Sequence, residues 1–467
     1  MGARALQTQR QGAEVVGQNL ANVNNPAYAR QRLLVQSSAA LPTLAGPEGT
    51  GVDASSIQQL RSALLDQQIQ NELSTSGFLE SRQGALEYIQ AALAEQLDGQ
   101  TASAGGTSTV GNSDSSSGLA DDLDSLFNAF QSLSTAPGSL VERQLVLAQA
   151  QSLARKFNQT DQRLQNLKSS LNDSVSTDLD KANTLIRNIA DLNNQIVNAE
   201  SGTGGIANDL RDLRQQKIEE LSQLINIETN ASDNGAVDLS TGGHALVSGC
   251  LLLDTLQTYD VSDNRLLVRT ANSELPLTLT GGSIQGAIDT RDGALADLRQ
   301  SVNKLAGSLI SEVNRLHSTG FNLDGGTGAP FFTGTNAADI GVSTTLLDHP
   351  ALIQAAGDQG TPGDNQVALA LARLANQKQD ALDGQTFSKA YSRTVAALGQ
   401  SLATTNTQID DQKVVQNMLL SRRDSISGVS LDEEMTELVK YQKAFEASAR
   451  LITTVNEMLD DVINLKR

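Results

Sequence analysis

The stretch that decides the fold closes the chain, where residues 430–467 read SLDEEMTELVKYQKAFEASARLITTVNEMLDDVINLKR. Ser430 and Glu433 have the spacing of a capping box and acidic residues fill the first turn, so a helix is predicted to begin here. Along this helix apolar residues recur every seven positions, at Leu431, Leu438, Phe445, Ile452 and Leu459. The alternate positions are mixed apolar and polar: Met435, Gln442, Ala449, Asn456 and Ile463. A one-sided apolar stripe of this length needs a partner helix, and polar residues in the seam favour one register.

The start of the chain supplies a candidate partner helix. Leu6, Ala13 and Leu20 are also spaced by seven, and Pro26 disfavours helical geometry at Asn25, so this helix is predicted to stop there. We therefore expect residues 1–35 and 428–467 to form a terminal coiled-coil domain. Periodicity alone favours a simpler alternative, in which both ends pack on the body of the protein.

Long helices are predicted for the body of the chain. Two tracts without proline, 138–275 and 363–467, leave room for them, because proline breaks helix interiors. Apolar residues follow helical spacing in the first tract, at Phe157, Leu164, Leu171, Leu185, Ile189, Leu192 and Ile196. A narrow apolar stripe of this kind suits packing in a bundle. The helical rod is expected to comprise residues 36–225, 285–320 and 365–427.

Between residues 226 and 284 the pattern changes to short β-type runs separated by turn pairs such as Gly242-Gly243. Strands are predicted at 251–256, 265–270 and 275–280. Loops and a few short strands are expected in the Gly- and Pro-rich segment 321–364, and a flexible loop in the Ser-rich stretch 99–118. The predicted fold is mainly α with an inserted β domain: a terminal coiled coil, a long helical-bundle rod, and a small β-rich outer domain of residues 226–284 and 321–364.

Composition excludes several classes of function. The 467 residues carry 53 acidic against 34 basic side chains, for a formal charge of −19, which disfavours binding to nucleic acid. No apolar run reaches the roughly 20 residues of a membrane span, and no apolar core of a cleaved signal peptide follows the first residues. Cys250 is the only cysteine, so no intrachain disulfide can form. The three histidines are scattered outside metal motifs, and no phosphate loop or nucleophile elbow is present. We expect no catalytic, cofactor or metal site and no enzymatic activity.

Both ends of the chain resemble the signatures of bacterial flagellar axial proteins. The N-terminal signature is NLANVNNPAYARQ at residues 19–31, with Asn19, Asn22, Tyr28, Arg30 and Gln31 as its motif residues. The C-terminal signature comprises SGVSLDEE at 427–434, YQKAF at 441–445 and ASAR at 447–450. Rod, hook and hook-associated proteins share versions of these ends, so the ends alone indicate the superfamily.

Interior blocks make the chain similar to the first hook-associated protein family. They are NDLRDLR at 208–214 with ELSQL at 220–224, GG and DTRD at 281–292, and NRLHSTGFNL at 314–323. Two departures stand out. Ala27 occupies a position where the family usually has glycine. The sequence also lacks about ten residues of the family's usual leading helix, roughly three turns. We therefore expect either a different turn at Ala27 and a shorter coiled coil, or a mis-set start.

The resemblance implies a structural subunit that joins the flagellar hook to the filament and assembles through its terminal helices. The interface residues it implies are Leu6, Ala13, Leu20, Leu431, Leu438, Phe445, Ile452 and Leu459. Implied partners are other copies in a tubular assembly, the hook protein, the second junction protein, and an export chaperone at the C-terminal helix. Export without a cleaved signal would place the protein outside the cell, in the flagellum. The alternatives are a hook or rod protein, or a secreted adhesin that borrows a flagellar export signal.

Overall fold

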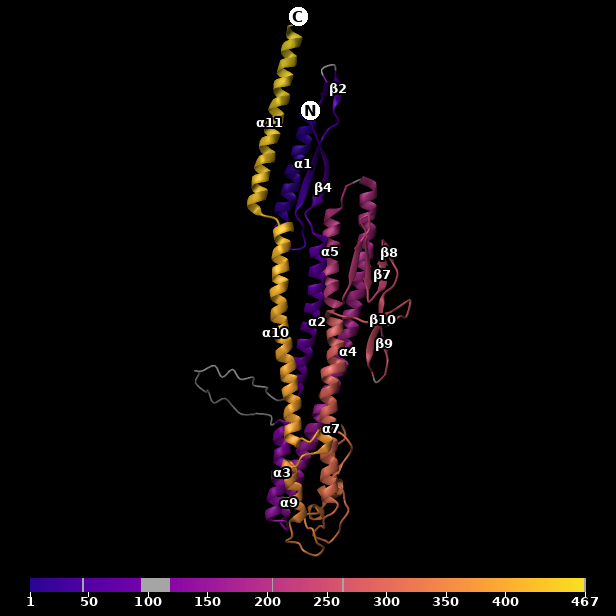
Figure 1. Cartoon of the computed structure of the whole chain (residues 1–467), viewed down its shortest axis with the longest axis vertical. Helices are drawn as coiled ribbons and strands as arrows, with labels where there is room; N and C mark the ends of the chain where they lie inside the picture. Colours follow the sequence, from indigo (N-terminus) through magenta and orange to yellow (C-terminus); the bar gives the residue numbers. More distant parts are fainter. Residues whose placement is uncertain (44–45, 94–117, 204, 263, 466–467) are drawn as a thin grey trace, which may run out of the picture.

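The computed structural model describes residues 1–43, 46–93, 118–203, 205–262 and 264–465. The chain is elongated, with both termini at one end of a helical rod (Figure 1). Most of the predicted flexible loop 99–118 lies outside the described residues. The mainly helical architecture with a small inserted β region confirms the predicted fold class.

The rod is a bundle of helices with one large apolar core and a smaller separate cluster between α2 and α10. Its longest member, α4, is a single helix of 64 residues, and its predicted stripe is buried, with Phe157 and Leu164 0% exposed. The helices of the rod are α2 (Ala63–Leu93), α3 (Leu119–Thr135), α4 (Leu140–Thr203), α5 (Asn208–Leu224), α6 (Gly282–Thr290), α7 (Ala296–His317), α9 (Gln366–Arg373) and α10 (Phe387–Ser427). A π-helical turn, Arg291–Leu295, joins α6 to α7.

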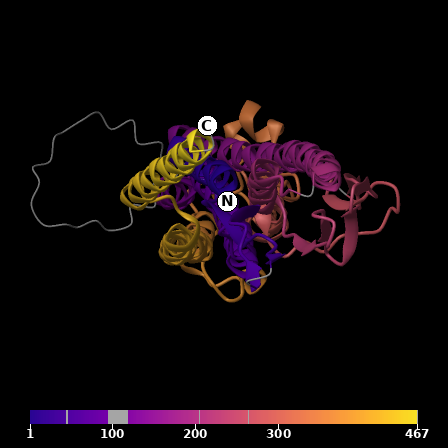
Figure 2. The same cartoon turned by 90° about the horizontal axis from the view of Figure 1, so that it is seen from above.

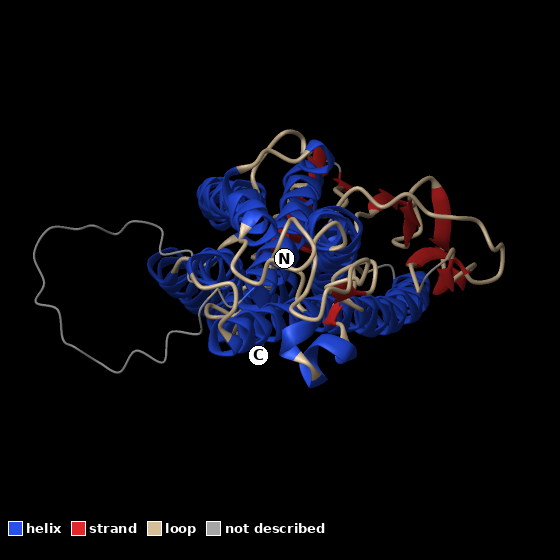
Figure 3. Cartoon of the chain, turned by 90° about the horizontal axis from the view of Figure 1, so that it is seen from below, coloured by secondary structure: helices blue, strands red, loops and turns tan. Residues whose placement is uncertain are grey.

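The β region beside α4 is formed by two small antiparallel units that project from the rod (Figures 1 and 2). The four-stranded sheet has the order β5-β6-β7-β8, and β9 pairs with β10. The strands are β5 (Glu228–Ala231), β6 (Val237–Thr241), β7 (His244–Ser248), β8 (Leu251–Leu252), β9 (Leu256–Asp260) and β10 (Leu266–Thr270). The predicted strand 275–280 forms only one isolated bridge, Arg269 to Pro276. Figure 3 shows these strands to one side of the helices.

Residues 321–364, which we expected in the same β-rich domain, lie instead at the end of the rod away from the termini (Figure 1). They contain β11 (Phe332–Thr333), β12 (Gly341–Val342) and α8 (Thr344–Asp348), and β11 pairs only with β12. Phe331 and Phe332 are 0% and 1% exposed, and the Phe331 ring packs with Phe130 and His317 of the helices and with Phe332. The fully buried Arg143 of α4 also donates to the carbonyl oxygens of Ala351 and Ile353. Burial of these aromatic rings in the rod core explains why the segment packs at the end of the rod and not in the β region.

Residues 31–59, most of which we expected in the helical rod, form strands beside the first helix. β1 (Gln31–Ser37) pairs antiparallel with β4 (Val52–Gln59), and β2 (Leu41–Thr43) with β3 (Gly46–Glu48). Pro42 and Pro47 exclude a helix here, and Gly51 takes a positive φ of 115° before β4. This hairpin therefore extends the terminal part of the molecule.

Candidate assembly interface at the chain termini

The two terminal helices lie side by side and run antiparallel (Figure 1). They are α1 (Gly2–Ala21) and α11 (Leu431–Asn464). Near the rod Asn19 bonds to Glu434, farther out Gly12 faces Tyr441, and at the tip Gly2 faces Ile452. Residue numbers fall along α11 as they rise along α1, so one register holds along the whole of α1.

Asn19 fixes the base of this helix pair through four hydrogen bonds. Its Nδ2 donates to the carbonyl oxygen of Gln31 and to Glu434 Oε2, each at 2.9 Å. Its Oδ1 accepts from the Tyr28 hydroxyl at 2.9 Å and from the backbone N–H of Gln31 at 3.0 Å. The side chain is 1% exposed, so this buried amide is fully satisfied. Burial, followed by the charges of Asp209, Asp212 and Glu434, raises the pKa of Tyr28 and keeps its hydroxyl protonated.

Arg30 clamps the start of α11 onto the N-terminal segment. Its Nη1 lies 2.6 Å from Glu433 Oε2 and its Nε lies 2.7 Å from Glu434 Oε1. Burial alone would lower the pKa of Arg30, but its bonds to Glu433 and Glu434 raise the pKa above its usual value. The backbone N–H of Arg30 donates to the carbonyl oxygen of Ser427 at the end of α10. The motif arginine thus joins α10, α11 and the N-terminal segment.

The other side of the N-terminal segment is bound to helix α5 of the rod. Asp212 accepts from the backbone N–H of Ala29 at 3.2 Å and from Arg61 Nη2 at 2.9 Å. Asp209 accepts from the Gln31 side chain at 3.1 Å. Burial raises the pKa of Asp212 to about 6, although Arg61 and the Ala29 bond oppose that rise. The joint between rod and terminal helices is therefore a polar network of opposite charges.

Two motif positions have local roles at the end of α1. Asn22 caps the helix, and its Nδ2 donates to the carbonyl oxygen of Gln18. Asn25 Oδ1 accepts from the backbone N–H of Ala27, which forms a turn around Pro26. Ala27 does not have a positive φ, so alanine in place of the usual glycine causes no backbone strain here.

The seam predicted on α1 lies at the edge of its contact face. Leu6, Ala13 and Leu20 are each only half-buried. The buried positions are Thr8, Gly12, Val15, Val16 and Asn19. The contact face is wider than a two-helix seam because α1 packs both on α11 and on the β1–β4 hairpin.

The predicted stripe on α11 is only partly covered. Leu438 and Ile452 are half-buried, whereas Leu431, Phe445 and Leu459 are 54%, 42% and 55% exposed. Other large apolar side chains on α11 are also exposed: Met435, Val439, Leu451, Val455, Met458, Val462, Ile463 and Leu465. An apolar surface of this extent is typical of a protein–protein interface. We name the regularly spaced subset Leu451, Val455, Met458, Val462 and Leu465 the outer stripe.

Sequence analysis missed the acidic and basic side chains that join the helices to the rod: Arg61, Asp209, Asp212, Glu433 and Glu434. The acidic pair at the start of α11 looked like ordinary helix-dipole residues. Asp209 and Asp212 are three apart, which places them on one face of a helix. That spacing was the available signal, but it did not identify the partner segment.

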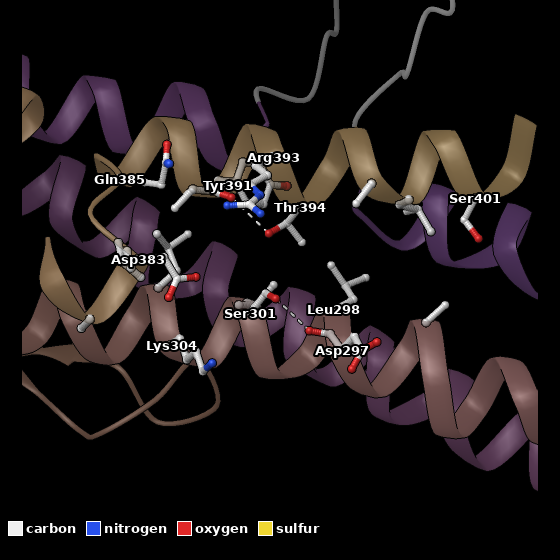
Figure 4. A pocket seen from close by; sticks show the side chains of 18 of the residues that line it. Asp297, Leu298, Ser301, Lys304, Asp383, Gln385, Tyr391, Arg393, Thr394 and Ser401 are labelled. Carbon is white, nitrogen blue, oxygen red and sulfur yellow. Dashed lines mark hydrogen bonds between the residues drawn. The ribbon is translucent and has the colours of Figure 1, made fainter. Parts of the chain in front are cut away.

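A second candidate site is a cavity of about 530 Å³ between α7 and α10 (Figure 4). Asp297 and Lys304 line it from α7 and Arg393 from α10, while Leu298 and Tyr391 supply apolar surface. Its charges are mixed, and nothing in its lining specifies a ligand. Among the described residues no group of His, Cys, Asp and Glu could hold a metal ion. No described helix is long and apolar enough to cross a membrane.

The chain is similar to known flagellar proteins over almost its whole length. Residues 108–332 match the family described as flagellar hook-associated protein FlgK helical domain, and residues 421–465 match the flagellar basal body rod FlgEFG protein C-terminal family. Flagellar hook-associated protein 1 of Bacillus subtilis is 26% identical, covering 99% of this chain and 96% of that protein. The Escherichia coli protein of the same name is 23% identical, with 96% of each covered.

A solved structure shares the fold. It is that of the flagellar hook junction protein FlgK from Burkholderia pseudomallei. The TM-score is 0.66 at 15% sequence identity, and the match covers 77% of this chain and all of that structure.

Proposed function

We propose that this chain is a member of the flagellar hook-associated protein 1 family, a structural subunit of the hook–filament junction that assembles there through its two terminal helices. Leu6, Ala13, Leu20 and the apolar residues of α11 would form the interface. The motif residues would hold that interface in place on the rod.

One observation carries this proposal: α11 presents a long apolar surface that no described residue covers. Its Phe445, Leu459 and Met458 are 42%, 55% and 55% exposed, whereas the core positions of the rod, such as Phe157 and Leu164, are 0% exposed. Exposed apolar surface of this size costs free energy in water until a partner covers it. Neighbouring copies in a tubular assembly would supply that cover.

The remaining partners follow from position in the flagellum. The hook protein would contact one side of the ring of copies and the second junction protein the other. The chain would reach this place by export through the flagellar type III apparatus and would lie outside the cell. We assign it no enzymatic activity, cofactor or nucleic-acid partner.

Two alternatives remain open to experiment. A hook or rod protein would share the terminal signatures, but the match of residues 108–332 to the FlgK helical domain favours the junction protein. A secreted adhesin using a flagellar export signal would leave the deletion strain with intact filaments. A deletion that still builds hooks but releases filament monomers into the medium supports the junction role.

The substitution Phe445→Asp tests assembly through α11. A carboxylate at this position would be buried without a partner in the assembled interface, at a cost of several kcal/mol, whereas in the monomer the site is partly in water. Cells with this variant should build hooks, lack filaments and secrete unpolymerised flagellin. The control Lys443→Asp places the same carboxylate on the polar face, where Lys443 is 71% exposed, and should swim normally. Normal swimming of the Phe445→Asp strain would contradict the interface.

We also propose that an export chaperone covers α11 before assembly, since an exposed apolar stripe self-associates and an amphipathic helix fits an apolar groove. A peptide of residues 427–467 should bind the family's export chaperone nearly as tightly as the full chain. A chain lacking those residues should lose binding in calorimetry, whereas one lacking residues 1–30 should keep it. Retained affinity without the C-terminal segment would exclude this role.

A further inference from the structure

Gly12 leaves space for an aromatic ring in the middle of the terminal helix pair. It lies on the buried face of α1, opposite Tyr441 of α11. A Cβ atom added at Gly12 would lie under 3.0 Å from three carbon atoms of the Tyr441 ring. The helices can therefore approach this closely only because position 12 carries no side chain.

Other alignments of the two helices leave no equivalent space for the Tyr441 ring. A shift by one helical turn, about 5.4 Å, would place the Tyr441 ring opposite Thr8 or Val16, and both carry side chains. Gly2 repeats the arrangement at the tip, where an added Cβ would overlap Ile452. By contrast, Gly17 has nothing within 4 Å of the equivalent position.

The base of the pair is fixed by a different kind of contact. Asn19 is fully hydrogen-bonded only when Glu434 lies beside it, and a buried polar residue in a helix seam disfavours shifted registers. The distance from Asn19 to Gly12 along α1 equals the distance from Glu434 to Tyr441 along α11, seven residues each. Both contacts therefore demand the same alignment.

We propose that Gly12 sets the register of the terminal helix pair by leaving space for the Tyr441 ring. This register fixes the position of the outer stripe along the helix pair and the direction in which it faces. The proposal rests on the proposed function, because the outer stripe is the surface that neighbouring copies would bind. Gly12 is a positioning residue: it is buried between the two helices and acts through Tyr441.

The register can be measured in the isolated full-length chain. Spin labels at Ala21 and Glu457, introduced after replacing Cys250 with serine, report the spacing along the pair by pulsed electron paramagnetic resonance. Gly12→Leu should shift that distance by about 5 Å, the rise of one turn, or broaden its distribution as the helices separate. Gly17→Leu, the same change on the solvent side of α1, should leave the distance unchanged.

A compensating variant separates register from general destabilisation. In the double variant Gly12→Leu/Tyr441→Ala the leucine enters the space vacated by the ring, so the wild-type distance and swimming should both return. Tyr441→Ala alone removes the ring and should broaden the distribution. A wild-type distance in Gly12→Leu, or no recovery in the double variant, would overturn the proposal. If the distances behave as stated but junctions form regardless of register, the assembly function of the outer stripe fails instead.

Discussion

The same seven-residue apolar pattern is buried in one helix of this molecule and partly exposed in another. In α4, Phe157 and Leu164 are 0% exposed because neighbouring rod helices cover them. In α11, Phe445 and Leu459 are 42% and 55% exposed. Helix α1 covers one side of α11, and the first residue of α1, Gly2, lies level with Ile452, so α1 does not reach Leu459. An apolar stripe therefore shows that a helix needs a partner, but not whether that partner belongs to the same chain.

The largest expected effect separates these two helices directly. Phe157→Ala should lower the free energy of unfolding of the monomer by about 3–5 kcal/mol, because it leaves a cavity in a closed core. Phe445→Ala should change that free energy by less than about 0.5 kcal/mol, because the ring is half in water. Urea unfolding of both variants measures the contrast, and equal losses would show that α11 is part of the monomer's core.

The joint between the two regions should respond to pH through Asp212. Burial raises its pKa from 3.8 to about 6, so the folded chain holds the proton more tightly than the unfolded chain. The resulting stabilisation is fully present below pH 3.8 and is lost as the pH rises to about 6, on the order of 2–3 kcal/mol.

The variant Asp212→Asn isolates this dependence from that of other carboxylates. The free energy of unfolding of the wild type, minus that of the variant, should fall between pH 4 and pH 6 and stay level from pH 7 to 8. Urea unfolding across this range provides the measurement. A difference that does not vary with pH would show that Asp212 titrates normally.

A smaller effect is expected where Asn19 joins α1 to α11. Asn19→Ala removes the hydrogen-bond partner of the buried Tyr28 hydroxyl and of Glu434 Oε2, which should cost about 1–3 kcal/mol. Asn22→Ala is the matched control, since Asn22 makes one exposed bond to Gln18. The opening free energy of α1, from native-state hydrogen exchange, should drop for Asn19→Ala and hardly change for Asn22→Ala. Similar opening free energies for the two variants would show that Asn19 does not stabilise the joint.

The smallest effect belongs to the solvent side of α1. Arg10 and Glu14 form an ion pair at 3.3 Å, with side chains 63% and 59% exposed. Arg10→Gln should cost only about 0.3–0.5 kcal/mol in the opening free energy of α1, and salt should remove the difference. A loss above 1 kcal/mol would show that this face is covered in the monomer.

Much of the fold could be predicted because local patterns determine it. Helical spacing from Phe157 to Ile196 located α4, the expected rod segment 285–320 contains α7, and Pro26 marked the end of α1. The position of residues 321–364 could not be predicted, because it depends on contacts such as that of Phe331 with Phe130 of α3, a helix distant in sequence. Tertiary packing of this kind leaves no periodic trace in a short segment.

The candidate site was only partly visible in the sequence. The motif residues Asn19, Tyr28 and Arg30 come together as a joint, yet Glu434, which binds Asn19, is 415 positions away, and Asp212, which binds the backbone of Ala29, is 183 positions away. Seam positions on α1 shifted because the β1–β4 hairpin shares its contact face. Pairings between such distant residues depend on the folded topology.

Hydrogen exchange on the verified monomer and on isolated hook–filament junctions tests the central claim most directly. Amides of α4 should be protected in both samples. Amides of α11 beyond Ile452, which carry most of the outer stripe, should exchange rapidly in the monomer and become protected in the junction, because isolated helical turns are marginal without packing. Strong protection of this segment in the monomer, or rapid exchange in the junction, would contradict assembly through α11.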